Sequence, residues 1–119
     1  MSGDLALVKQ GYADLFYEDM KGYAKRCLQF TVEFTSVPQL CRAIRLVKQY
    51  ENFCGDGVAV VVNMFSDSIL SGKFGREYSP VLYLTVKSGT DAQQIIGALK
   101  MQQANEVTFT NGCIRAWWD

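Results

Sequence analysis

Apolar and polar side chains alternate strictly along residues 28–35, which predicts a β-strand with one apolar and one polar face. A helix-start signal follows at once. Ser36 is suited to cap the first free N–H groups of a helix, Pro38 fits the first turn, and Gln39 stands three residues after the serine. We therefore expect a helix from this point to about Tyr50.

The same succession recurs later in the chain. Residues 81–87 follow Pro80 and have the pattern of a strand, and Thr90 with Gln93 repeats the capping pattern. This predicts a second helix over residues 91–103. The repeat indicates two strand-then-helix units in one fold.

Between these units lie two segments with weaker patterns. Residues 58–65 are rich in valine and apolar on both faces, so we predict a strand there. Residues 66–79 contain several glycines and polar groups, which are typical of a long connector. We expect that connector to be a solvated hairpin loop.

The chain ends in a predicted β-hairpin. Asn111 and Gly112 both tolerate the positive φ that a two-residue type I′ turn requires. Such a turn would place Phe109 opposite Ile114 on the apolar face. The two flanking segments agree on which face is apolar, and this agreement favours the register.

Residues 4–25 carry apolar side chains at helical spacing and predict an N-terminal helix. The 119 residues then form one domain, with the helix in residues 1–26 and an α+β sandwich in residues 27–119. The order of the middle elements, βαββαβ, resembles that of ferredoxin-like sandwiches. The resemblance concerns element order alone, so it implies a fold and no function.

In such a sandwich one sheet face is covered by the two later helices, and the other face mixes apolar with charged groups. Its candidate ligand-binding or interface residues are Glu33, Val61, Asn63, Phe65, Tyr83, Arg115 and Trp117. A face this apolar needs a cover, which is the N-terminal helix, a second subunit, or a ligand or partner protein. Arg115 would hold a carboxylate there, unless Glu33 and Arg115 form a structural ion pair across the strands.

The amino-acid composition excludes several classes of catalytic and metal-binding site. The chain has no histidine, which excludes Ser–His and Cys–His pairs and histidine ligands for metals. Twelve basic residues balance twelve acidic ones, and this neutrality disfavours general nucleic-acid binding. The four cysteines, Cys27, Cys41, Cys54 and Cys113, lack zinc-site spacing. Without a signal peptide or an apolar run long enough to span a bilayer, we expect a cytoplasmic protein with reduced thiols and no membrane association, metal or cofactor.

We therefore expect a small non-catalytic binding protein that recognises a protein partner or a small ligand, such as an accessory or inhibitor protein. The alternative is a cofactorless or flavin-assisted enzyme in a dimeric α+β barrel, and RNA binding through Tyr83 and Trp117 is a third option. A homodimer is also expected, because residues 58–65 would form an apolar edge strand without a charge or proline to block pairing.

Overall fold

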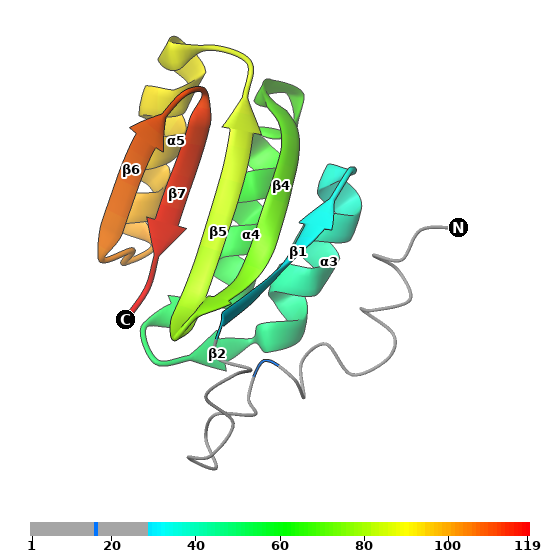
Figure 1. Cartoon of the computed structure of the whole chain (residues 1–119), viewed down its shortest axis with the longest axis vertical. Helices are drawn as coiled ribbons and strands as arrows, with labels where there is room; N and C mark the ends of the chain where they lie inside the picture. Colours follow the sequence, from blue (N-terminus) through cyan, green and yellow to red (C-terminus); the bar gives the residue numbers. More distant parts are fainter. Residues whose placement is uncertain (1–15, 17–28) are drawn as a thin grey trace.

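The computed structural model describes Phe16 and residues 29–119 of the chain. The described part is an α+β fold with one five-stranded antiparallel sheet and three α-helices. In spatial order the sheet contains β1 (Gln29–Phe34), β4 (Ile69–Glu77), β5 (Ser79–Val86), β7 (Cys113–Trp117) and β6 (Glu106–Thr110). The helices α3 (Val37–Val47), α4 (Gly55–Met64) and α5 (Gly89–Met101) lie behind the sheet in Figure 1, on one face.

Both predicted strand-then-helix units are confirmed. Strand β1 leads into α3, where the Ser36 hydroxyl oxygen accepts a hydrogen bond from the Gln39 N–H at 3.3 Å. Strand β5 leads into α5, but the cap is Ser88 and not Thr90. The Asp91 N–H donates to the Ser88 hydroxyl oxygen at 3.2 Å, so this helix begins two residues earlier than predicted.

The terminal hairpin also forms as predicted. Asn111 and Gly112 connect β6 to β7 with φ values of 53° and 77°. Phe109 lies opposite Ile114 in the register of the two strands. The positive φ at both turn positions explains why this dipeptide closes the hairpin without splaying the strands.

The strand predicted over residues 58–65 is wrong, because residues 58–64 belong to helix α4. Its buried residues Gly55, Val58, Ala59 and Val62 have the i, i+3, i+4, i+7 spacing of a helix face. A Cβ atom on Gly55 would lie 2.5 Å from the Ile44 carbonyl oxygen of α3. The two helices therefore approach closely enough at this point that only glycine fits.

The connector predicted over residues 66–79 is also wrong. A short 3-10 turn, Ser66–Ser68, leads into β4, a nine-residue strand that lies between β1 and β5 in the sheet. Gly72 and Gly75 serve packing in this strand rather than a turn. A Cβ atom would lie 2.6 Å from a Leu40 methyl group at Gly72 and 2.1 Å from the Phe30 carbonyl oxygen at Gly75.

These two corrections change the topology. The helices α3 and α4 follow each other, joined by a small hairpin of β2 (Gln49–Tyr50) and β3 (Phe53–Cys54), before the chain enters β4. The strand order β1-β4-β5-β7-β6 does not confirm the ferredoxin-like arrangement. The dimer argument from an edge strand at residues 58–65 also fails, because that segment is a largely buried helix.

The hydrophobic core lies between the sheet and the helices. Phe34, Leu82, Leu84 and Ile114 face the helix layer and are completely buried. No element that the structure describes covers the opposite sheet face, which we call the open face (Figure 1).

The predicted N-terminal helix lies outside the described residues apart from Phe16. That side chain is buried on the helix side of the sheet, where it stacks on Phe74 at 5.5 Å. The Phe16 carbonyl oxygen accepts a hydrogen bond of 2.8 Å from the Arg76 guanidinium, which also donates to the Tyr50 hydroxyl. Phe16 therefore contributes to the core and not to a cover of the open face.

Candidate functional site

A polar cluster on the open face brings together three of the predicted site residues. Tyr83 and Arg115 lie opposite each other on β5 and β7, and both bind the carboxylate of Glu77. Arg115 donates to one Glu77 oxygen at 2.6 and 3.0 Å and to Glu106 at 3.2 Å, and the Tyr83 hydroxyl donates to the other Glu77 oxygen. The Trp117 indole N–H donates to the Glu77 carbonyl oxygen at 2.9 Å.

The electrostatics of this cluster hold each group in its ordinary charge state. Burial opposes ionisation of Glu77, but hydrogen bonds from Tyr83 and Arg115 and the positive charge of Arg115 outweigh burial and lower the pKa of the carboxyl. Burial and the bond to Glu77 raise the pKa of Tyr83. For Arg115, burial alone would lower the pKa, but the contacts with Glu77 and Tyr83 raise it. None of the three pKa values is moved toward neutrality, as a general acid or base would need.

Glu33 shares the open face but lies away from this cluster. It is directly opposite Lys73 on β4, and β4 and β5 separate it from Arg115 on β7. The carboxylate partners of Arg115 are therefore Glu77 and Glu106 in place of the predicted Glu33. The sequence does not indicate Glu77, because the glycines and polar groups of residues 66–79 predict a connector and hide its position on a sheet face.

The other three predicted residues are not on the sheet: Val61 and Asn63 are on α4, and Phe65 follows it. Val61 is only 6% exposed, and Phe65, just after the helix, packs against the core. Asn63 is exposed and lies on a different surface of the molecule, beside α3. The structure therefore separates these residues from Tyr83, Arg115 and Trp117.

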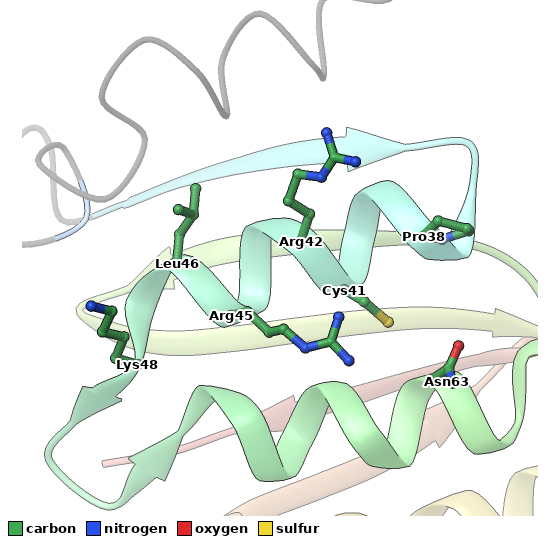
Figure 2. A pocket seen from close by; sticks show the side chains of 7 residues that line it. All are labelled: Pro38, Cys41, Arg42, Arg45, Leu46, Lys48 and Asn63. Carbon is green, nitrogen blue, oxygen red and sulfur yellow. The ribbon is translucent and has the colours of Figure 1, made fainter.

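A groove between α3 and α4 forms a second candidate site, which Figure 2 shows from close by. Its volume is about 570 Å³. The residues that line this α3–α4 groove are Pro38, Cys41, Arg42, Arg45, Leu46, Lys48 and Asn63. It therefore combines apolar groups with three cations, and no carboxylate is among the lining residues that the structure describes.

The three cations of the α3–α4 groove are exposed and spread apart. In Figure 2 the Arg45 side chain extends into the space toward Asn63, while Arg42 and Lys48 point in other directions around it. None of the three forms an ion pair with another residue that the structure describes. Their positive charge is therefore available to an external anion.

Cys41 lines the groove but is not suited to act as a nucleophile. The residue is 2% exposed, and its thiol donates a long hydrogen bond of 3.6 Å to the Ala59 carbonyl oxygen. Burial raises the pKa of this thiol, and the nearby charge of Arg45 opposes the shift only in part. Because the thiolate is the reactive form, Cys41 contributes packing rather than chemistry.

The cations of the groove can be recognised from their spacing in the sequence. Arg42, Arg45 and Lys48 recur every third residue and lie outside the apolar stripe of the predicted helix. Arg42 and Arg45 lie on the exposed surface of α3, and Lys48 follows directly after the helix as its C-cap residue. The groove itself could not be predicted, because its other wall is α4, which the valine-rich pattern had assigned to a strand.

Comparison with known proteins adds no further assignment: no family model, no curated protein and no solved structure matches the chain. Within residues 29–119 and Phe16, no helix is both long enough and apolar enough to cross a membrane. The same residues contain no group of three acidic or cysteine side chains arranged to hold a metal ion.

Proposed function

We propose that the protein is a non-catalytic binding module and that its α3–α4 groove binds an acidic segment of a partner protein. The observation that supports this proposal is the set of three cations, Arg42, Arg45 and Lys48, with no acidic side chain among the described residues that line the groove. Unpaired cations beside apolar groups are complementary to a segment that mixes carboxylates with apolar side chains.

The exposure of the groove favours a protein segment over a small ligand. Small-molecule sites bury most of the ligand surface, whereas all three cations of this groove are exposed. A partner protein would cover them from outside, as the rim of an interface does. Pro38 and Leu46 would supply the apolar contact.

The expected contribution of the charges is moderate. An exposed ion pair is worth about 0–1 kcal/mol, so three pairs supply up to about 3 kcal/mol, or roughly a hundredfold in affinity. Salt screens such pairs, and binding should therefore weaken as ionic strength rises. The apolar contacts must supply the remaining free energy of binding.

The open-face cluster does not favour the two alternatives. Its Glu77, Tyr83 and Arg115 are bonded to one another with pKa values held away from neutrality, which is unlike a catalytic acid–base pair. For RNA binding, Arg115 of this face is already paired with Glu77 and Glu106, so its charge is not free to bind a phosphate.

The test uses a short fluorescein-labelled peptide that contains only glutamate and leucine, with fluorescence anisotropy as the readout. The Arg42→Glu, Arg45→Glu double variant should lose most of the binding. The Lys87→Glu, Lys100→Glu double variant changes the net charge equally at exposed positions outside the groove lining and should retain it. Thermal melts would show that both variants remain folded.

Three results would contradict the proposal. The peptide could fail to bind more tightly than a matched lysine–leucine peptide. The two double variants could lose affinity equally, which would indicate attraction by net charge alone. Displacement of the peptide by inorganic phosphate at a similar concentration would indicate a site for small anions.

A further inference from the structure

Strand β6 is an edge of the sheet whose outer side faces no other strand that the structure describes. Glu106, Thr108 and Thr110 are exposed, and Phe109 is 37% exposed although it lies on the helix side of the sheet. An exposed edge strand is a template for pairing with another chain.

The direction of the backbone groups on this edge follows from the register. Gly112 and Trp118 make their backbone hydrogen bonds to β5, at 3.0 Å in each case. Along a strand, the backbone groups of successive residues point alternately to the strand on one side and the strand on the other. Because the even-numbered Gly112 and Trp118 bond to β5, the odd-numbered residues of β7 bond to β6. Their partners Thr108 and Thr110 therefore face β7. The N–H and C=O groups of Val107 and Phe109 consequently point outward.

The β6 edge also lacks the features that normally prevent pairing. The strand Glu106–Thr110 contains no proline and no lysine. Its one charged residue, Glu106, is bound to Arg115 on the neighbouring strand. The net charge of the chain is zero, so no long-range repulsion opposes the approach of two copies.

We propose that β6 pairs antiparallel with β6 of a second copy of this chain, around a two-fold axis at Thr108. In this register Val107 of each copy lies opposite Phe109 of the other. The four outward N–H groups and four outward C=O groups of Val107 and Phe109 then have partners, and the two sheets become one continuous sheet of ten strands.

The side chains of β6 fit the same register. Glu106 of one copy lies opposite Thr110 of the other, so no like charges meet. Thr108 lies opposite its own counterpart, which is a favourable cross-strand pair. Phe109 and Val107 meet on the helix side, where pairing would cover part of the exposed phenyl ring. This self-complementarity favours a second copy over an unrelated strand.

The association should depend on concentration. A contact through one five-residue strand is smaller than a standard stable interface, so we expect a reversible dimer. Sedimentation velocity of the full chain over a dilution series should show a shift from 13.4 kDa toward twice this mass.

Two matched variants test the register. Thr108→Lys places two lysines side by side on the axis and should weaken the dimer by about tenfold or more. Thr110→Lys adds the same charge two residues away, where it faces Glu106 of the other copy, and should leave the dimer intact or tighten it. Both side chains are exposed, so the fold should tolerate either change.

A third variant, Val107→Pro, removes one outward N–H without removing a bond to β7 and should also weaken the dimer. The proposal is wrong if the unmutated protein stays at 13.4 kDa at the highest concentration reached. It is also wrong if Thr108→Lys and Thr110→Lys have equal effects on association while both melt like the unmutated protein. Because none of these residues lines the α3–α4 groove, such a failure would leave the proposed function untouched.

Discussion

A substitution at Gly112 measures the free-energy cost of a positive φ alone, because a side chain there would not clash with other atoms. The φ of Gly112 is +77°, and a Cβ atom placed on it would meet nothing within 4 Å. Gly97, in the exposed surface of α5, also has open space around its Cβ position but has no positive φ. The same substitution, glycine to alanine, should therefore have opposite effects at these two positions.

The magnitudes follow from backbone energetics. An L-residue in the left-handed region costs about 1–2 kcal/mol, so Gly112→Ala should lower the free energy of unfolding by that amount, and Gly112→Val by more. Gly97→Ala should raise it by about 0.5–1 kcal/mol, because alanine loses less conformational freedom in a helix. With an unfolding entropy of about 2.1 cal/mol/K per residue, 1 kcal/mol corresponds to a Tm shift of about 4 °C in this chain.

The assay is thermal unfolding followed by circular dichroism, supported by urea titration. We expect a fall in Tm of about 4–8 °C for Gly112→Ala and a rise of about 2–4 °C for Gly97→Ala. An unchanged or higher Tm for Gly112→Val would refute the reasoning, because valine strongly resists positive φ. A fall in Tm for Gly97→Ala would show that crowding, and not backbone freedom, decides the outcome there.

Two further predictions concern pH and the thiols. The pKa of Glu77 lies below its ordinary value in the folded state. Ionisation of Glu77 therefore stabilises the fold fully at pH values above the ordinary carboxyl pKa. This stabilisation is lost as the pH falls through the lowered pKa of the folded state. Glu77→Gln should therefore flatten the acid side of the stability–pH curve measured by urea unfolding, and an unaltered curve would contradict the prediction. All four cysteines should react with an alkylating reagent during denaturation without a reductant, and fewer than four adducts by mass spectrometry would reveal a disulfide.

The elements that the sequence predicted correctly carry local signals. Alternation along residues 28–35, the Ser36 cap and the Asn111-Gly112 turn each act through neighbours in the chain. Such local signals predict secondary structure without knowledge of the tertiary contacts. For α5 even the cap residue was misplaced, because Ser88 and Thr90 are both capable of capping a helix.

The elements that were missed depend on distant packing. The valine-rich α4 has apolar residues on nearly every side, so its period could not be read, and the β propensity of valine favoured the wrong assignment. In β4 the glycines suggested a turn, whereas Leu40 and the Phe30 carbonyl oxygen leave no room for a side chain. Such contacts exist only after the fold has formed.

Of the two candidate sites, the sequence predicted part of the open-face cluster and none of the α3–α4 groove. Tyr83, Arg115 and Trp117 were placed together correctly because they lie on well-predicted strands. The α3–α4 groove was not predicted, because a groove between two helices requires both of them, although its cations stand at regular spacing in the sequence, two on α3 and Lys48 directly after it.

The two tryptophans at the end of the chain report on different parts of the molecule. Trp117 is half-buried on the open face, while Trp118 is completely buried and packs edge-on against Phe53 at 4.9 Å. Consecutive residues of an extended chain point to opposite sides, so two adjacent fluorophores sample two environments. A Trp117→Phe variant would emit from the core alone and a Trp118→Phe variant from the open face alone. The protein thus carries its own pair of optical probes, one for unfolding and one for events at the sheet surface.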